Sequence, residues 1–229
     1  MEATAFSEAT VRRAEGIAGR GSALLWRALD VLIAAALLLL LLPVLVCAAV
    51  VIRLDSPGPA LFRQRRLGIG TQPFTMHKFR TMHRDAESES HRDYVSRLIT
   101  GTAEAFERAD GPLYKLADDD RVTRVGRLLR RWSIDELPQL WDVLRGEMSL
   151  VGPRPAIPYE LAHYEPDWYR RFSVRPGITG LWQVSGRSRL TFSEMVSLDI
   201  AYAENRSLWL NLRILAKTVP VVLLGKGAA

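Results

Sequence analysis

The chain has 229 residues, of which 48% are hydrophobic and 24% are charged, and its formal net charge is +6. These proportions are near the averages for globular proteins, so they exclude an intrinsically disordered or collagen-like chain. The single cysteine, Cys47, excludes an intramolecular disulfide and a cysteine-rich zinc site. The four histidines lack the spacing of helical metal ligands, so zinc chemistry is not expected either.

A polar N-terminal arm, residues 1–26, precedes a long apolar segment, residues 27–54. No charged residue occurs from Val31 to Ile52, and an unbroken helix over that stretch would measure ~33 Å, about the thickness of a bilayer hydrocarbon core. A buried helix of a soluble protein is the alternative, but such helices rarely stay apolar on all faces. The pattern therefore predicts membrane insertion, and the position and length of the segment argue against a cleaved signal.

Basic residues flank the apolar segment on both sides. They are Arg12, Arg13, Arg20 and Arg27 before it, and Arg53, Arg63, Arg65 and Arg66 after it. The preference of basic flanks for the cytoplasm therefore favours the same side for both ends. A helix broken at Pro43 would allow this, because proline lacks an amide donor and clashes with the preceding turn. The sequence predicts a re-entrant helix broken at Pro43, with an ordinary kinked span as the alternative.

The net charge is concentrated just after this segment. Residues 53–84 hold seven basic residues against Asp55 alone, and the rest of the chain sums to zero. A basic stretch next to a membrane suits anionic headgroups or phosphorylated substrates. Nucleic acid would also suit a basic stretch, but no nucleic-acid-binding motif accompanies it, so we expect no nucleic-acid partner.

Residues 55–229 are expected to form one cytoplasmic domain with a mostly helical α+β fold. A turn is predicted at 56–59 and a hairpin at 61–82, with Gly68 and Gly70 between its strands. Helical patterns follow, with glycine- and proline-rich loops between several of them, at 84–108, 122–131, 133–146, 159–172 and 192–224.

The sequence Ser133-Ile134-Asp135-Glu136 has the form of a capping box, with serine as the N-cap and glutamate three residues later. In the structural interpretation the two acids only complement the helix dipole. In the functional interpretation, free amides at the helix start lower the pKa of Asp135 and keep it ionised as a nucleophile. Glu136 would then help to hold Mg²⁺, which takes one or two carboxylates together with phosphate oxygens.

Arginines lie on both sides of this acidic pair in the sequence. Arg130 and Arg131 precede it, and Arg154 follows it between two prolines that restrict the backbone. A restrained arginine near an acidic helix start suits phosphoryl chemistry, where charge develops on phosphate oxygens. The alternative is a structural turn with a solvated arginine. Three acids at 118–120 are a second, weaker candidate for a metal site.

Together these motifs carry a resemblance to a known family. The chain resembles the bacterial sugar transferases, the polyprenyl-phosphate hexose-1-phosphate transferases or monotopic phosphoglycosyl transferases. The resemblance covers most of the chain and is specific because of the joint order and spacing of its segments. These are GPALFRQRRLG at 58–68, KFRTM at 78–82, RVTRVG at 121–126, DELPQLW at 135–141, GEMSLVGPRP at 146–155 and RPGITGLWQVSGR at 175–187.

The resemblance implies an enzyme that transfers a hexose 1-phosphate from a UDP-sugar to undecaprenyl or another polyprenyl phosphate and releases UMP. It implies a covalent phosphosugar on Asp135 and a Mg²⁺ role for Glu136. Such an enzyme would lie on the cytoplasmic face of the bacterial inner membrane, begin exopolysaccharide, capsule or O-antigen synthesis, and be compatible with a homo-oligomer. The expected substrate- or phosphate-binding residues are Lys78, Arg80, Arg130, Arg154 and Gln183.

Two features depart from the family pattern. Leu42 precedes Pro43 where some members carry serine, and the short polar arm replaces the additional N-terminal spans of larger members, so the chain resembles the minimal catalytic form. Two other functions remain as alternatives. One is a non-catalytic membrane scaffold for polysaccharide assembly, and the other is a metal-dependent glycosyltransferase that uses the acids at 118–120 and releases UDP.

Overall fold

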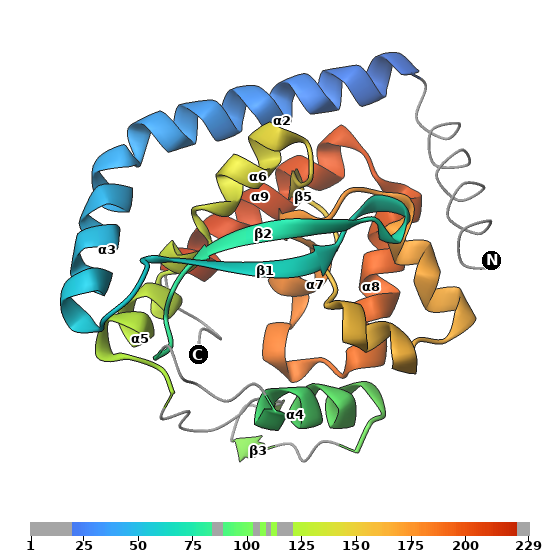
Figure 1. The fold of residues 1–229 in the computed structure, drawn as a ribbon. Helices are drawn as coiled ribbons and strands as arrows, with labels where there is room; N and C mark the ends of the chain where they lie inside the picture. The colour runs from blue at the N-terminus through green and yellow to red at the C-terminus, as the bar shows by residue number, and fades with distance from the viewer. Residues whose placement is uncertain (1–19, 84–88, 103–105, 109–110, 114–120, 224–229) are drawn as a thin grey trace.

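The computed structural model describes residues 20–83, 89–102, 106–108, 111–113 and 121–223 (Figure 1). Within these ranges the fold is α+β and mostly helical, with three small two-stranded sheets, as the sequence predicts. Figure 1 shows two N-terminal helices along one side of the molecule and a β-hairpin across its middle.

The two N-terminal helices, α2 (Arg20–Leu40) and α3 (Leu42–Asp55), form a bent pair. Among the described residues, no single helix is both long and apolar enough to cross a membrane. Leu24–Leu40 and Leu42–Asp55 satisfy that requirement only together, with a bend of 61° between them. Much of their apolar surface is exposed, since Leu39 is 76% and Leu54 81% accessible. Contiguous apolar surface of this kind marks an interaction site.

The bend lies slightly earlier than the sequence predicts. The helical backbone is interrupted at Leu41, while Pro43 lies in the first turn of α3. A proline in the first turn costs little because the amide there has no intrahelical partner. The amide of Leu41 donates to the carbonyl of Leu37, and its own carbonyl accepts from the amide of Leu45.

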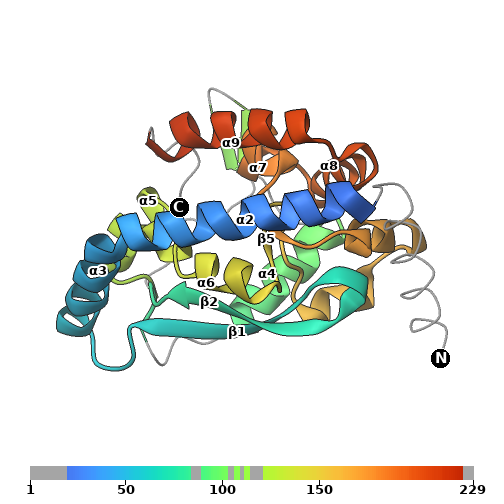
Figure 2. The same cartoon turned by 90° about the horizontal axis from the view of Figure 1, so that it is seen from above.

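One face of α2 packs on the rest of the fold, over α6 (Gln139–Arg145) and β5 (Ser149–Val151). Figure 2 shows α2 running between α9 (Leu208–Leu223) and the β-hairpin. Ala34 is completely buried in the main hydrophobic core. The segment is therefore part of the packed structure along one face and apolar but uncovered along the other.

The predicted hairpin is confirmed as antiparallel strands β1 (Leu61–Leu67) and β2 (Pro73–Phe79), joined by the 3₁₀ turn η1 (Ile69–Thr71). It is attached to α6 through Asp142, which is fully buried. The carboxylate of Asp142 accepts the amide of His77 at 2.9 Å and contacts Nδ1 of the same residue at 2.6 Å. This attachment orients β2 so that its next residue, Lys78, reaches the candidate site.

The helix expected at 159–172 is wrong in form, because that stretch contains two 3₁₀ helices, η3 (Pro158–His163) and η4 (Pro166–Ser173). Each begins with a proline, which lacks the amide that a continuous α-helix would need.

The remaining elements are α4 (Glu89–Ile99), β3 (Phe106–Arg108), β4 (Gly111–Leu113), α5 (Arg124–Arg131), η2 (Ile134–Glu136), β6 (Gly177–Thr179), α7 (Leu181–Ser185), η5 (Arg187–Arg189) and α8 (Phe192–Asn205).

Strands β5 and β6 pair in parallel, which the sequence does not predict. Ser149 pairs with Gly177, and Val151 with Thr179. The strands approach so closely that a Cβ atom on Gly177 would lie 2.0 Å from the amide nitrogen of Gly152. The two glycines therefore allow the backbones around the candidate site to meet.

A substitution at Gly126 tests the packing between α5 and the end of the hairpin. A Cβ atom there would lie 2.1 Å from the carbonyl oxygen of Thr81, so Gly126→Ala should separate the two segments. We expect a loss of about 1–3 kcal/mol in the free energy of unfolding, measured by thermal or chemical denaturation in detergent. Gly68→Ala is the matched control, because its Cβ would make only ordinary contacts from 3.4 Å. Equal stability of the two variants would contradict the packing described.

Candidate active site

The predicted acidic pair lies on the short 3₁₀ turn η2 rather than at a capped α-helix. Ser133 has left-handed backbone angles (φ 53°, ψ 24°), and its side chain makes no capping hydrogen bond. The prediction of a capping box at Ser133 is therefore wrong. Leu137 and Pro138 keep right-handed helical angles, but Pro138 has no amide to donate, and α6 begins only at Gln139. The predicted end of that helix is confirmed, since Gly146 caps it with a positive φ of 86°.

Glu136 contacts two cations from distant parts of the chain. Its Oε1 atom lies 2.9 Å from Nζ of Lys78 on β2 and 3.9 Å from Nη1 of Arg154, which follows β5. Burial by itself raises the pKa of Glu136, but the charges of Lys78 and Arg154 and the bond from Lys78 outweigh it and hold the pKa below its usual value. Burial lowers the pKa of Lys78, against the pull of Glu136.

The pKa of Asp135 is shifted in the opposite direction from that of Glu136. Burial, followed by the charge of Glu136, raises its pKa, while Lys78 and Arg130 act in the other direction. The expectation that the start of a helix lowers the pKa of Asp135 is therefore wrong, because desolvation and the adjacent carboxylate outweigh the backbone. Adjacent carboxylates with opposite shifts are suited to different roles in a reaction.

A pocket opens beside Glu136 and is lined by basic and amide side chains. Lys78, Arg154 and Gln183, all predicted site residues, line it together with Arg66. Gln183 donates to the carbonyl of Ile178 at 3.0 Å, while its own Oε1 is buried and finds no hydrogen-bond partner within the described ranges. The pocket thus gathers the positive charge and polar groups that a diphosphate needs.

Arg66 is a site residue that the sequence analysis placed only within the basic flank. Its guanidinium donates to the carbonyl of Pro155 at 2.8 Å and twice to Oε1 of Gln64. Burial, and then the neighbouring charge of Arg154, lower its pKa to about 10. Side chains alternate between the two faces of β1, so Arg63 and Arg65 are exposed while Arg66 points inward. This alternation is the only feature of the sequence that indicates the inward orientation of Arg66.

The segment that carries Arg154 is held by hydrogen bonds to its carbonyls. The donors are Tyr202 Oη to Val151 (2.9 Å), the Gly177 amide to Pro153 (2.9 Å), Arg171 Nη2 to Arg154 (3.0 Å) and Arg66 Nη1 to Pro155 (2.8 Å). These donors come from four separate elements. The restraint expected from the two prolines is therefore reinforced by the tertiary structure.

Arg171 is itself fixed by a buried network that the sequence analysis missed. Its guanidinium contacts the carboxylate of Asp199 at 2.5 Å and Tyr164 Oη at 2.6 Å. Both charged residues are buried, and burial raises the pKa of Asp199 to about 6 even though Arg171 opposes the shift. Arg171 and Asp199 are 28 residues apart, so no local pattern in the sequence predicts their contact.

Two other predicted site residues bind elsewhere in the structure. Arg130 donates to Thr81 Oγ1 at 2.9 Å and acts on Asp135 through its charge. Arg80 is buried away from the pocket lining, and its two Nη groups donate to the Ser56 and Pro57 carbonyls at 2.7 Å. This geometry favours a structural role for Arg80, and its phosphate-binding role stays a prediction.

The acidic residues of this site are suited to a metal ion whose remaining ligands come from the substrate. No group of three or more potential ligands among His, Cys, Asp and Glu occurs in the described part of the chain, and residues 118–120 lie outside it. Asp135 and Glu136 supply two adjacent carboxylates beside a cationic pocket. Mg²⁺ takes one or two carboxylates when phosphate oxygens complete its coordination, so these residues fit such a site.

Comparisons with known proteins agree on one family. Residues 21–225 match the family described as Bacterial sugar transferase. The chain is 45% identical over 207 residues to the UDP-glucose:undecaprenyl-phosphate glucose-1-phosphate transferase of Caulobacter vibrioides, covering 86% of this chain and 69% of the relative. It is 43% identical over 190 residues to the galactosyl transferase CpsE of Streptococcus agalactiae, covering 80% of this chain.

The relatives differ in length. The chain spans only 40% of the streptococcal relative. It spans 87% of the exopolysaccharide production protein ExoY of Rhizobium meliloti, to which it is 39% identical over 202 residues that cover 88% of this chain.

The raised pKa of Asp135 generates a prediction about stability. An acid whose pKa is raised on folding binds its proton more tightly in the folded state, so its ionisation destabilises the fold as the pH rises. Asp135→Asn should therefore increase the free energy of unfolding at pH 7.5, by about 0.5–2 kcal/mol, the range typical of stabilising substitutions. The gain should shrink as the pH falls toward about 4, the pKa of the unfolded residue. Thermal unfolding across pH measures it, with the exposed Asp167→Asn as control. A gain independent of pH would contradict this interpretation.

Proposed function

Because this chain belongs to the bacterial sugar transferase family, we propose that it transfers a hexose 1-phosphate from a UDP-sugar to a polyprenyl phosphate and releases UMP. The observation that carries the proposal is the contact of Glu136 with Lys78 and Arg154, next to the partly buried Asp135. The names of relatives support the chemistry, since they include an undecaprenyl-phosphate glucose-1-phosphate transferase and an undecaprenyl-phosphate galactose phosphotransferase.

In the proposed reaction Asp135 is the nucleophile. A carboxylate oxygen of Asp135 forms a bond to the phosphorus that carries the sugar, and the bond from that phosphorus to the bridging oxygen of the diphosphate breaks. UMP leaves with the electron pair of the broken bond, and the sugar phosphate remains on Asp135. The raised pKa makes the ionised Asp135 a stronger base, and hence a better nucleophile, than an ordinary aspartate.

The second half of the reaction regenerates the carboxylate. A phosphate oxygen of the polyprenyl phosphate bonds to the same phosphorus, and the bond to Asp135 breaks with its electron pair returning to the carboxylate. Arg154 and Lys78 would stabilise the charge that develops on the phosphoryl oxygens in both steps. The carbonyl contacts of segment 151–155 would hold Arg154 in place without further ordering on substrate binding.

Mg²⁺ is the cofactor that the site would accept. Glu136 would hold it, with oxygens of the diphosphate as further ligands, and it would supply charge neutralisation at the leaving group. Glu136 suits this role because its lowered pKa keeps it ionised at neutral pH. Lys78, 2.9 Å away, would then be available to the substrate when Glu136 binds the cation.

We further propose that α2 and α3 form a re-entrant element in the cytoplasmic leaflet of the bacterial inner membrane. Its support is the 61° bend, the exposed apolar surface and the basic residues at both ends. This placement would bring residues 55–229 to the cytoplasmic face, where a water-soluble UDP-sugar and a membrane-bound acceptor can meet at one site.

Trapping of the covalent intermediate tests the reaction. Purified protein is incubated with a radiolabelled UDP-sugar without lipid acceptor, and protein-bound label and UMP are measured. Wild-type protein should retain label at Asp135, and Asp135→Asn should retain none and lose transfer by several orders of magnitude. Asp167→Asn should behave as wild type. Transfer by the Asp135→Asn variant at the wild-type rate, or release of UDP in place of UMP, would reject the proposal.

Cysteine labelling in intact cells tests the membrane placement. The native Cys47 is first replaced by serine, and single cysteines are introduced near position 10 and at Ala229. Both should resist a membrane-impermeant reagent added outside and react after the cells are opened. Pro43→Ala should favour a continuous helix long enough to span, which would expose one end to the outside. Outside labelling of one end in the protein that retains Pro43 would establish a straight span instead.

A further inference from the structure

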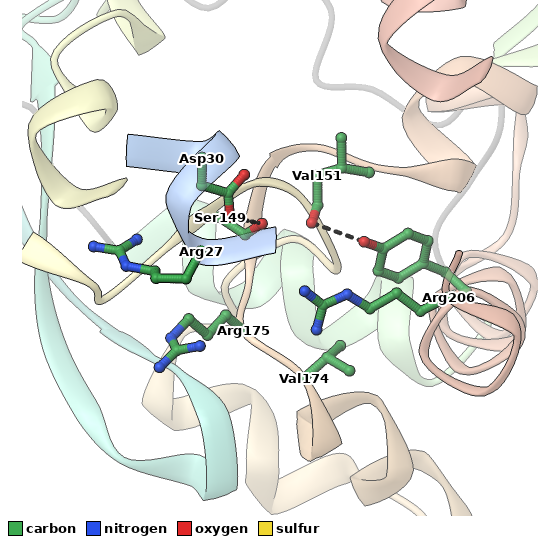
Figure 3. A pocket seen from close by; sticks show the side chains of 8 residues that line it. Arg27, Asp30, Ser149, Val151, Val174, Arg175 and Arg206 are labelled. Carbon is green, nitrogen blue, oxygen red and sulfur yellow. Dashed lines mark hydrogen bonds between the residues drawn. The ribbon is translucent and has the colours of Figure 1, made fainter. Parts of the chain in front are cut away.

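A second pocket lies on the other side of β5, against α2. Figure 3 shows three arginines around it, each from a separate segment: Arg27 on α2, Arg175 just before β6, and Arg206 between α8 and α9. This pocket and the one beside Glu136 share no lining residue. This pocket is therefore distinct from the one that is lined by Glu136 and Arg154.

Positive charge exceeds negative charge among the residues that line this pocket. Asp30 is the acid among them, and both of its oxygens are engaged by β5. Oδ2 accepts from Ser149 Oγ at 2.6 Å, and Oδ1 accepts from the Leu150 amide at 3.2 Å. Three arginines therefore line this pocket against one carboxylate, whose hydrogen bonds come from β5, and Nε of Arg175 donates to the carbonyl of Gly146 at 3.0 Å.

Two of the arginines also have buried donors without an acceptor. Arg27 Nη2 donates to the carbonyl of Leu144 at 2.9 Å, but Nη1 of the same group is buried and has no hydrogen-bond partner among the residues that the structure describes. Nε of Arg206 is likewise buried, and this atom has no hydrogen-bond partner in the described part of the chain. A buried N–H group without an acceptor is costly, and an anion bound at this pocket would supply oxygens as acceptors.

The pocket lies where the apolar segment begins. Arg27 is four residues before Val31, the first residue of the stretch without charge. The guanidinium of Arg206 lies 5.7 Å from the ring of Trp26, and Trp209 on α9 is 69% exposed. Tryptophan and arginine at the boundary of an apolar helix are typical of the headgroup level of a membrane.

We propose that this pocket binds the phosphate of an anionic membrane-lipid headgroup. The assignment rests on the membrane placement proposed above, which brings the pocket to headgroup depth. The arginines would bind the phosphate oxygens and disfavour headgroups that also carry a cation. Because Ser149 and Val151 line the pocket and β5 leads into the segment that carries Arg154, a bound headgroup would also steady that segment.

A thermal-shift titration without any sugar nucleotide tests the site. Detergent-solubilised protein is titrated with short-chain phosphatidylglycerol, which should raise the unfolding temperature to a plateau. Short-chain phosphatidylcholine, which carries a cation on its headgroup, should give a much weaker rise. Arg27→Gln and Arg206→Gln should each weaken the apparent affinity for phosphatidylglycerol by about tenfold or more. Arg213→Gln is the matched control, since Arg213 is an exposed arginine of α9 outside the pocket lining.

Several outcomes would overturn the assignment. One is equal stabilisation by the two lipids, and another is unchanged affinity in both pocket variants. A third is equal stabilisation by inorganic phosphate, which would make this a site for soluble anions. If a glutamine variant does not fold, the comparison of the two lipids on wild-type protein decides the matter. A protein that binds phosphatidylglycerol but transfers no sugar phosphate would reject the proposed function and leave this site standing.

Discussion

The carbonyl groups of residues 151–155 are the constraint on which the candidate site depends. Pro153 and Pro155 have no amide hydrogen, so the segment is held largely through its acceptors. Their donors come from α8, β6, η4 and β1, which are far apart in the sequence. The same loop thus joins the hairpin to the C-terminal helices and sets the position of the Arg154 side chain.

This arrangement requires charged groups in the interior. Arg171 is compensated by Asp199 and Tyr164, so its charge is buried with partners. Arg66 bonds only to neutral oxygens among the contacts described above, and its lowered pKa reflects that burial. Buried ionic groups contribute little net stability, but loss of one partner is strongly destabilising. The network is therefore better explained by the positioning of Arg154 than by stability.

The electrostatics of the acidic pair follow from the same packing. Asp135 and Glu136 are adjacent in sequence, yet their pKa values move in opposite directions. The difference arises because the bond and charge of Lys78 and the charge of Arg154 act on Glu136, whereas burial and the charge of Glu136 outweigh the charges of Lys78 and Arg130 at Asp135. One carboxylate is thus suited to remain ionised beside a cation, and the other is suited to act as a nucleophile. The hydrogen bonds of His77 to Asp142 support this division, since they orient the strand that carries Lys78.

The sequence by itself determined the features that depend on neighbouring residues. The hairpin, the Gly146 cap and the bend near Pro43 follow from local steric and hydrogen-bonding preferences, and the order of the motifs was enough to indicate the family. The parallel pairing of β5 with β6, the contact of Arg171 with Asp199 and the left-handed Ser133 were decided only by the tertiary structure. So was the direction of the Asp135 pKa shift, because desolvation and the charges that act on it come from residues brought together by packing.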